Sequence, residues 1–406
     1  MSSKEWRLLP LEDCMEAIID YRGKTPRKSS FGIPLITAKI VKGGRILEPT
    51  EFIPYEDYDE RMQRGIPKAG DVVVTTEAPL GEVGQLDNRK LSVGQRLITL
   101  RGKIGLLDNT YLKYLMMSEF VQNQLLARAT GTTVFGIKQA ELRKIELVIP
   151  PLPTQRRIAD ILSALDDKIE LNHQTNATLE AISQTIFKEW FVDFNFPDAT
   201  GEMEESALGM IPKGWRVGKI KDFSANIQYG FTQSASPLEI GPHFLRITDI
   251  QNGQIDWSNV PYCEVDEKQA KKYRIQNFDI FIARTGASTG ENVLVINPPN
   301  AVFASYLIRV QFLESPLAVY IGKLLRTSRY FEYIDSIKSG SAQPNANAQQ
   351  LTDLEIVLPP TDVMDLYFSV VVELEKLKTE HQTESSTLAT LRNTLLPKLM
   401  TREFEI

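Results

Sequence analysis

The polar side chains best suited to chemistry lie in four short loops that are rich in glycine and small polar residues. The loops are residues 284–290 (RTGASTG), 76–81 (TEAPLG), 131–138 (GTTVFGIK) and 340–347 (GSAQPNAN). Glycine lets a backbone approach another molecule closely, and guanidinium, amide and hydroxyl groups form directed hydrogen bonds. A guanidinium or an amide can pair with the two-atom edge of a nucleobase, and arginine also binds phosphate. The loops therefore predict recognition of a planar polar or anionic partner, with a plain turn or a solvated loop as the alternative.

The candidate contact residues are the polar side chains of these loops and a few side chains at nearby strand ends. Arg284 suits a guanine edge or a phosphate, and Glu77 can accept a hydrogen bond from a cytosine amine. Lys138 suits phosphate or guanine, and the amides of loop 340–347 suit adenine. The full set is Lys39, Thr76, Glu77, Arg96, Thr132, Thr133, Lys138, Arg246, Arg284, Thr285, Ser288, Tyr306, Ser341, Gln343, Asn345 and Asn347. Structural roles are an equal alternative for Lys39, Arg96, Arg246 and Tyr306.

No group of residues has the spacing of a catalytic site. The run 297–300 (NPPN) is similar to the N-P-P-aromatic motif of adenine methyltransferases, but Asn300 stands where an aromatic residue would stack on the flipped base. Glu291 follows the glycines at 286 and 290, where a phosphate-binding loop has lysine. The histidines and cysteines are too scattered for a nucleophile–base pair or a metal site; they are His173, His243, His381, Cys14 and Cys263. We expect a non-catalytic chain with no metal or cofactor of its own; a standalone DNA methyltransferase is the alternative.

The charge of the chain is distributed unevenly along its length. The 406 residues carry a net charge of -6, which at first argues against a polyanionic partner. By segment, the net charge is +3 for residues 1–152, -6 for 153–213, 0 for 214–360 and -3 for 361–406. The two longest segments therefore remain open to an anionic partner. No apolar run is long enough to span a membrane and the N-terminus lacks a signal-peptide core, so we expect a cytoplasmic protein.

The elements that must position the loops are those of an α+β fold. Short β-type runs at 34–37, 71–76 and 96–100 alternate with turn signals, and a helix-like run follows at 109–128. A last strand at 145–149 ends at two prolines. These features predict a domain with a curved, mostly antiparallel sheet plus helices.

This order of signals occurs twice. Shifted by 209 residues, Trp6-Arg7 falls on Trp215-Arg216, and the run 147–151 (LVIPP) falls on 356–360 (IVLPP). We therefore expect an internal pseudo-two-fold repeat of two similar domains, each followed by a long helix. The expected boundaries are residues 1–152 (domain), 153–193 (central helix), 194–213 (linker), 214–360 (domain) and 361–406 (C-terminal helix).

The two long helices carry apolar residues at heptad spacing, which predicts pairing of one helix with another. The predicted seam residues are Ile158, Leu162, Leu165, Ile169, Asn172, Asn176, Leu179, Ile186, Trp190, Leu374, His381, Leu388, Leu395 and Leu399. Under the same shift, Asn172 and Asn176 fall on His381 and Ser385, so both helices have a polar middle that favours one register. At about 1.5 Å per residue the central helix would extend roughly 55 Å, which predicts a spacer with an interaction face, not an ordinary core helix. We expect the two helices to form an antiparallel coiled coil.

Two similar but diverged domains joined by a rigid spacer suit two different short features at a fixed separation. DNA presents features in this way, and diverged halves predict an asymmetric, bipartite site. The alternative from another class is a coiled-coil scaffold or adaptor whose paired domains bind protein.

Three motifs resemble one family closely. The runs 157–172 (RIADILSALDDKIELN), 187–191 (FKEWF) and 206–215 (SALGMIPKGW) resemble conserved regions of the DNA-specificity (S) subunit of type I restriction-modification enzymes. The C-terminal helix matches the family pattern less closely than the central one. The resemblance covers essentially the whole chain and implies two target recognition domains, spaced by helices that dock two methyltransferase (modification) subunits. It also implies that motor-nuclease restriction subunits join the complex and that S-adenosylmethionine binds the modification subunit.

Overall fold

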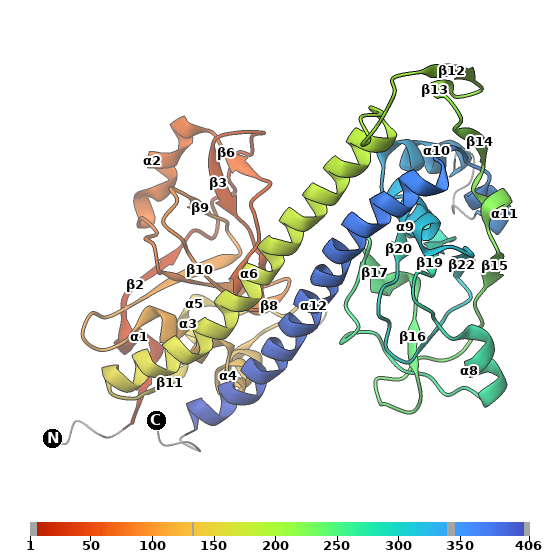
Figure 1. Cartoon of the computed structure of the whole chain (residues 1–406). Helices are drawn as coiled ribbons and strands as arrows, with labels where there is room; N and C mark the ends of the chain where they lie inside the picture. The colour runs from red at the N-terminus through yellow and green to blue at the C-terminus, as the bar shows by residue number, and fades with distance from the viewer. Residues whose placement is uncertain (1–5, 132–133, 339–345, 402–406) are drawn as a thin grey trace. The chain divides into compact units, whose positions relative to one another are not determined.

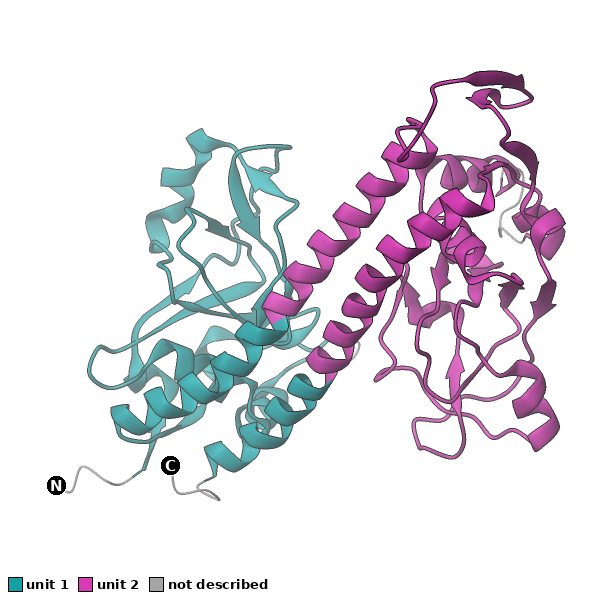
Figure 2. Ribbon diagram, in the orientation of Figure 1, with its two compact units in different colours: residues 1–169, 387–406 teal, residues 170–386 magenta. Residues whose placement is uncertain are grey.

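The structure, a computed structural model, describes residues 6–131, 134–338 and 346–401 (Figure 1). The chain divides into two compact units, which are drawn in different colours in Figure 2. Unit 1 comprises residues 1–169 and 387–406, and unit 2 comprises residues 170–386. We call the part of unit 1 that precedes the central helix domain 1, and residues 214–360 of unit 2 domain 2.

Domain 1 is built on a four-stranded antiparallel sheet of order β2-β10-β7-β8. Its strands are β1 (Arg7–Pro10), β2 (Met15–Asp20), β3 (Ile33–Ile36), β4 (Val41–Lys42), β5 (Arg45–Ile46), β6 (Phe52–Ile53), β7 (Val72–Thr76), β8 (Leu80–Gln85), β9 (Ser92–Val93), β10 (Leu97–Gly102) and β11 (Glu146–Ile149). Its helices and 3-10 turns are α1 (Leu11–Cys14), η1 (Tyr55–Asp57), α2 (Tyr58–Arg61), η2 (Met62–Arg64), α3 (Asn109–Met117), α4 (Glu119–Arg128) and α5 (Gln139–Leu142). The predicted helical run 109–128 is thus two helices. Ser118 interrupts it because its backbone is extended and its hydroxyl caps α4.

Domain 2 repeats this plan with a four-stranded antiparallel sheet of order β15-β22-β19-β20. Its strands are β14 (Arg216–Lys219), β15 (Asn226–Tyr229), β16 (His243–Leu245), β17 (Ile250–Gln251), β18 (Gln254–Ile255), β19 (Ile280–Ala283), β20 (Asn292–Leu294), β21 (Ala301–Phe303), β22 (Leu307–Gln311) and β23 (Glu355–Leu358). Its helices and 3-10 turns are α7 (Ile220–Phe223), η3 (Ile247–Asp249), α8 (Glu267–Tyr273), η4 (Gly286–Ser288), α9 (Ser315–Leu324), α10 (Ser328–Lys338) and α11 (Ala348–Thr352). Before domain 2, the segment expected to be a linker contains the hairpin of β12 (Met203–Ser206) and β13 (Gly209–Pro212).

Each central sheet is covered on both faces. In β7, Val72 and Val74 point into a core shared with α3, while Val73 points into a second core shared with β3. In β19, Ile280 and Phe281 are likewise divided between two cores. The sequence of a strand that is buried on both faces is a continuous apolar run, because successive side chains point to opposite sides of the sheet and both sides are covered. The mostly antiparallel α+β architecture and its internal repeat are therefore confirmed.

The two long helices are α6 (Leu152–Phe191) and α12 (Thr361–Met400), and residues of both helices belong to each unit. In unit 2, Asn172 of α6 faces Ser385 of α12, while Asn176, further along α6, faces His381, which lies earlier in α12. The two helices are therefore antiparallel, as predicted (Figure 1).

The ends of the long helices are part of the domain cores. Ile158 and Leu162 of α6 are fully buried in the core of unit 1, and Phe187 and Phe191 of α6 are buried in the core of unit 2. The expectation of a helix distinct from the cores is therefore wrong for these turns, because each helix is covered by a domain as well as by its partner helix. Within the described residues, no helix combines the length and apolarity needed to cross a bilayer.

Candidate nucleic-acid interface

In domain 1, backbone hydrogen bonds bring three predicted contact segments together at one end of the sheet. The amide of Thr76, at the end of β7, donates to the carbonyl of Arg96 at 2.9 Å. The carbonyl of Thr76 accepts from the amide of Ile137 at 3.0 Å, and Glu77 forms an isolated β-bridge with Gly136. Segments 76–77, 96 and 136–137 are therefore neighbours although up to 61 residues separate them in sequence.

Two charged candidates of this cluster neutralise each other at the surface. Arg96 Nε lies 3.1 Å from a Glu77 carboxylate oxygen, and both side chains are about half exposed, at 52% and 48%. An exposed pair of this kind contributes little to folding stability, so either group can exchange its partner for another molecule. Lys138 is exposed just before α5, and the nearby aromatic ring of Phe135 is 53% exposed. Phe135 was not among the predicted contacts; its only sequence signal is an aromatic residue inside a glycine loop.

Domain 2 repeats the same backbone arrangement with different side chains. The amide of Arg284, which follows β19, donates to the carbonyl of Tyr306 at 3.0 Å. The carbonyl of Arg284 accepts from the amide of Ala346 at 2.9 Å. Thr76 and Arg284 therefore occupy equivalent positions, and so do Arg96 and Tyr306.

Arg284 lies between two tyrosine rings. Its guanidinium carbon is 5.4 Å from the ring centroid of Tyr229 and 5.7 Å from that of Tyr306, and its Nε donates to the carbonyl of Ser305 at 3.1 Å. Cation–π contacts restrain the guanidinium plane at a partly exposed position. Both rings remain accessible, with Tyr229 43% and Tyr306 54% exposed. Tyr229 was missed in the sequence, because it ends a strand that lies 55 residues before Arg284.

The other predicted contact residues lie outside these two backbone clusters or in the turn that follows Arg284. Thr285 and Ser288 belong to the turn after Arg284, with Ser288 closing η4. Lys39 is 82% exposed and lies 3.9 Å from Glu51. Arg246 makes a two-pronged contact with Asp249 at 2.8 and 3.0 Å, which raises the pKa of Arg246. The structural role considered for Arg246 is therefore favoured. Thr132, Thr133, Ser341, Gln343 and Asn345 lie outside the described residues.

Asn347 also has a structural role. Its side-chain oxygen accepts from the amide of Gln350 at 2.8 Å, and the Gln350 side chain accepts from the amide of Asn347 at 3.0 Å. This reciprocal pair caps the start of α11. The side-chain oxygen is therefore committed to the helix, which argues against Asn347 as an adenine-reading amide.

The residues weighed for catalysis are held in structural settings. The run 297–300 is a loop between β20 and β21, in which Asn297 has a positive φ of 51°. Both cysteine thiols are buried, and this burial raises the pKa of Cys14 and of Cys263 to about 11. A thiol with such a pKa is a poor nucleophile at neutral pH because little thiolate is present.

The polar middle of the helix pair is formed by the predicted residues of unit 2. The amide nitrogen of Asn172 donates to Ser385 Oγ at 3.2 Å and to Glu384 at 2.8 Å. The side-chain oxygen of Asn176 lies 2.9 Å from His381 Nδ1, and its amide nitrogen donates to the carbonyl of Lys378 at 3.0 Å. Each buried amide therefore has partners on the opposite helix. A shift in register would leave these amides unpaired, which is costly in a buried seam.

Burial along the helices departs from a plain heptad. Of the predicted seam residues, Ile158, Leu162, Ile169, Asn172, Asn176 and Leu399 are buried, and Leu165, Leu179, Ile186, Trp190, Leu374, His381, Leu388 and Leu395 are only half-buried. Asp166 is buried beside the half-buried Leu165. The heptad describes one covered face, whereas the domain covers a second face of each helix.

That second face carries a buried charge in unit 1, which we call ionic junction 1. Asp166 of α6 accepts from the Tyr114 hydroxyl at 2.6 Å and lies 3.2 Å from Lys113 Nζ, both on α3. Arg392 of α12 contacts the second carboxylate oxygen of Asp166 at 2.6 Å. Burial alone would raise the pKa of Asp166, but Lys113, Tyr114 and Arg392 together hold it below its usual value. The carboxylate is therefore charged and joins domain 1 to both helices.

Unit 2 contains the counterpart, ionic junction 2. Lys323 of α9 is 6% exposed and contacts Glu375 of α12 at 2.5 Å and Glu180 of α6 at 3.0 Å. Lys378 of α12 contacts both carboxylates as well. Burial would raise the pKa of Glu180, but Lys323 and Lys378 hold it at about 2. None of these residues was a predicted site residue; the available signal was a charged side chain beside an apolar seam position.

The depressed pKa of Glu180 predicts a pH dependence of stability. Its contribution is fully present above its ordinary pKa of 4.5 and is lost as the pH falls from 4.5 towards about 2. We expect Glu180→Gln to be less stable than the parent chain at pH 7, and the difference to shrink steadily below pH 4.5. Urea unfolding midpoints measured between pH 7 and pH 2.5 test this. Glu189→Gln, at an exposed position of the same helix, is the control; a Glu180→Gln deficit that persists unchanged at pH 2.5 would contradict the assignment.

Comparison with known proteins gives a consistent result. The family described as "Type I restriction modification DNA specificity domain" matches residues 3–181 and 212–382. The type I restriction enzyme MjaIX specificity subunit of Methanocaldococcus jannaschii is 25% identical over 431 residues, spanning 99% of this chain and 94% of that protein. The HindI specificity subunit of Haemophilus influenzae is 24% identical over 403 residues, spanning 83% and 87%. The crystal structure of the type I restriction-modification S subunit from M. genitalium matches with a TM-score of 0.61 at 15% identity, covering 98% of this chain and 97% of that one.

Proposed function

This chain belongs to the type I restriction-modification DNA specificity family, and on that premise we propose that it recognises an asymmetric, bipartite DNA site and recruits the catalytic subunits to it. Domain 1 binds one half-site and domain 2 binds the other. The chain itself is a non-catalytic subunit. Methyltransferase subunits supply S-adenosylmethionine and the methyl-transfer chemistry, and motor-nuclease subunits supply restriction.

One observation carries this proposal: the two domains present the same backbone cluster with different side chains. Domain 1 presents the pair Glu77 and Arg96, and domain 2 presents Arg284 between Tyr229 and Tyr306. A shared scaffold places each cluster at the same end of an equivalent sheet, while the side chains differ in charge and in hydrogen-bonding pattern. Base edges are distinguished by such patterns in the major groove, so two different half-sites are expected.

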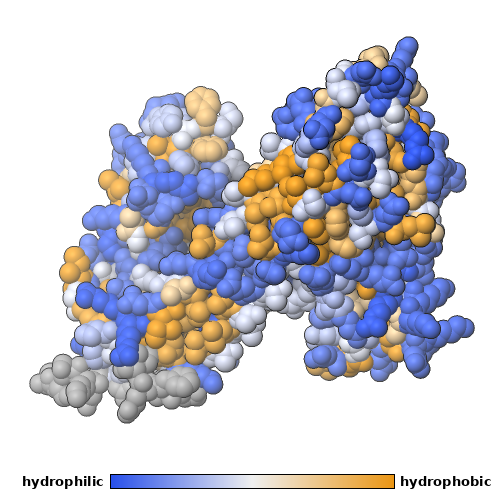
Figure 3. All heavy atoms as spheres, viewed as in Figure 1, coloured by the Kyte–Doolittle hydropathy of each residue, from blue (hydrophilic) through white to orange (hydrophobic). Residues whose placement is uncertain are grey.

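The recruitment of methyltransferase subunits rests on apolar side chains that the long helices leave exposed. On α12 these are Leu366, Val370 and Leu377, which are 44%, 41% and 43% exposed. Their spacing of four and seven residues places them on one face of the helix. Hydrophobic side chains also reach the surface of both units in the view of Figure 3. A partner helix packed on this face would bury them, as is typical of helix-mediated assembly.

Sequencing of methylated DNA from cells carrying the complete complex tests the proposal. We expect methylation at two short blocks of different sequence, separated by a spacer of fixed length and undefined sequence. Footprinting of the chain with its methyltransferase subunits should protect the same two blocks. If the complex shows no sequence preference at moderate salt, the chain is a protein-binding scaffold, and the recognition role is wrong.

Helix length should set the spacer, because α6 is one continuous helix with residues in both units. We expect matched insertions of four residues, after Asn176 in α6 and after Glu380 in α12, to lengthen the preferred spacer by about two base pairs, since four helical residues add about 6 Å. The insertion points face each other, so Asn172 stays beside Ser385 and Asn176 stays beside His381, whereas the hydrogen bond from Asn176 to the Lys378 carbonyl is lost. Methylation of substrates with graded spacers measures the change. An insertion of four residues after Gly201, in the loop before β12, is the control, and altered half-sites with an unchanged spacer would refute the assignment.

A further inference from the structure

The two ionic junctions occupy equivalent places in the repeat. Asp166 and Glu375 are separated by the same 209 residues that relate the two domains. Each carboxylate lies on a long helix and meets a lysine of the domain helix that packs there, Lys113 of α3 or Lys323 of α9. Both halves of the chain therefore join domain to helix through a buried charge at the same position.

The two junctions are built with opposite charges at their centres. In junction 1 a carboxylate, Asp166, is the centre and receives two cations and a hydroxyl. In junction 2 an ammonium, Lys323, is the centre and lies between Glu180 and Glu375. Lys323 contacts both α6 and α12, whereas Asp166 lies on α6 and contacts α12. A single side chain thus connects the domain to both long helices.

A glycine turn packs beside each junction. At Gly44, between β4 and β5, an added Cβ would lie 3.0 Å from the side chain of Met117 and 4.0 Å from the Asp166 carboxylate. At Gly253, between β17 and β18, it would lie 2.9 Å from Arg326. Both glycines have positive φ, 87° and 73°, which disfavours a larger residue. The first turn therefore lies close to the Asp166 carboxylate, and the second lines a small cavity together with Lys323 and Glu375.

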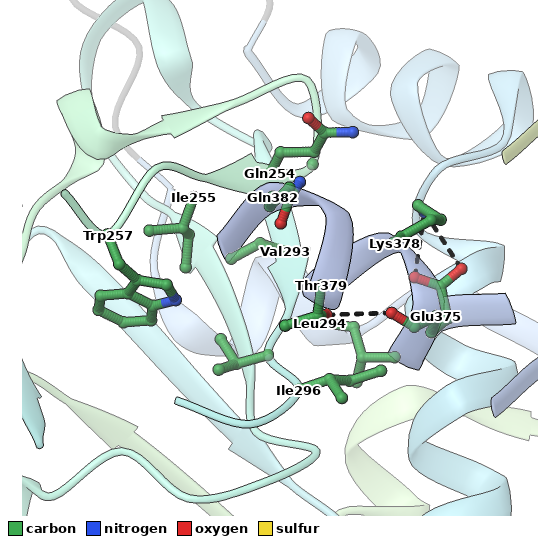
Figure 4. A pocket seen from close by; sticks show the side chains of 12 residues that line it. Gln254, Ile255, Trp257, Val293, Leu294, Ile296, Glu375, Lys378, Thr379 and Gln382 are labelled. Atoms are coloured by element: carbon green, nitrogen blue, oxygen red, sulfur yellow. Dashed lines mark hydrogen bonds and ion pairs between the residues drawn. The ribbon is translucent and has the colours of Figure 1, made fainter. Parts of the chain in front are cut away.

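The cavity beside junction 2 is too small to be a ligand site. It lies between the β17–β18 hairpin, β20 and α12, and Figure 4 shows Glu375, Lys378 and Gln382 of α12 along it. Its volume of about 50 Å³ admits a few waters but no cofactor or nucleotide. The charged groups along it instead contact one another, since Lys323 of the domain lies against Glu180 and Glu375 of the long helices.

Apolar packing by itself tolerates sliding better than a buried charge does. A domain helix that rotates or slides on α6 and α12 can exchange one apolar neighbour for another, but it would strand these charges without partners. An unpaired buried charge is strongly unfavourable, whereas the paired arrangement exists in one geometry only. Buried polar groups that specify a single arrangement are well attested in coiled coils.

We propose that Asp166 and Lys323 are positioning residues that fix the angle of each recognition domain on the helix pair, and thereby the spacer length that the complex accepts. This inference rests on the proposed recognition of a bipartite site. The junctions would act without contacting DNA, so the sequence of each half-site should not depend on them. The junctions would control only the spacer length between the half-sites.

The test is methylation by the complete complex with Lys323→Met, on substrates whose half-sites are constant and whose spacer varies one base pair at a time. Methionine has a similar length without the charge. We expect the parent complex to prefer one spacer length. The variant should lose about tenfold of its rate on that length and gain activity on the lengths one base pair shorter and longer. The half-site bases required should stay the same, which a general loss of folding would not produce.

Two further variants keep the outcome decisive. Lys213→Met removes an exposed lysine that pairs with Glu202 at 2.8 Å in unit 2, and it should leave the spacer profile unchanged. If Lys323→Met shows no cooperative transition in thermal unfolding, Glu375→Gln replaces it in the test, because this change removes one charge and keeps the shape of the side chain. A folded variant at either position with the parent spacer profile overturns the positioning role. If the parent complex itself shows no paired half-sites, it is the proposed function that fails.

Discussion

Replacing Asp166 with alanine should lower the free energy of unfolding of unit 1 by roughly 3–5 kcal/mol, the range typical for removing one partner of a buried ion pair. Asp166 is 9% exposed at its side chain, and its removal leaves the buried Lys113 and the half-buried Arg392 without their shared carboxylate. The change also deprives the buried Tyr114 hydroxyl of its acceptor. Urea unfolding followed by hydrogen exchange in α3 and α6 measures the loss in unit 1 separately from unit 2.

Asp167→Ala is the matched control, since Asp167 is the next residue of the same helix and is exposed. Its expected effect is within about 0.5 kcal/mol, as for most surface substitutions. A second comparison distinguishes the cost of leaving buried charges unpaired from the loss of the ion-pair attraction itself. The triple change Asp166→Leu, Lys113→Met and Arg392→Met should recover most of the stability, because apolar replacement of a whole buried pair is often neutral. A loss below about 1 kcal/mol for Asp166→Ala would show that ionic junction 1 is well hydrated.

Replacing Arg284 with alanine should reduce recognition of one half-site by about 5- to 150-fold, the range of a lost two-pronged contact to a base. Arg284 is restrained by Tyr229 and Tyr306, so little of its contact energy is spent on ordering the side chain. Competition binding of the complex to DNA with one half-site altered at a time measures the effect. Discrimination should fall at the half-site bound by domain 2 and remain intact at the other.

Arg284→Lys then distinguishes a base contact from a phosphate contact. Lysine keeps the charge but lacks the planar fork and stacks less well on aromatic rings. If Arg284 binds a base edge, lysine should fail to restore discrimination; if it binds a phosphate, lysine should restore most of the affinity at every sequence. Arg216→Ala, at an exposed arginine of β14, controls for general loss of positive charge. Equal losses at both half-sites would contradict the assignment of Arg284 to one of them.

The candidate contacts show how far residue types alone can predict a site. Loops 76–81 and 284–290 were predicted because polar residues and glycine directly follow an apolar strand, a pattern that is local in sequence. Tyr229 was not predicted, because Arg284, which lies over its ring, is 55 residues away in the chain. Arg246 and Asn347 were included on residue type, and the structure shows each in a local hydrogen bond.

The sequence by itself determined the architecture of this protein: two similar α+β domains, two long helices and their antiparallel pairing. These features follow from local periodicities and from the 209-residue repeat, both of which are visible without knowing any contact. A polar middle at Asn172 and Asn176 was also predictable, because amides in an otherwise apolar seam seek partners on the facing helix.

Only the tertiary structure decided which helix positions are buried and where the charges go. A heptad describes one partner, but each helix here is covered by a second helix and by a domain, so Leu165 is half-buried and Asp166 is buried. For the same reason the ionic junctions were not predicted: Lys113 and Asp166 are 53 residues apart, and a charged side chain beside the seam residue Leu165 does not by itself identify its partner. Long-range packing assigns such residues their partners, and periodicity along the chain cannot contain that information.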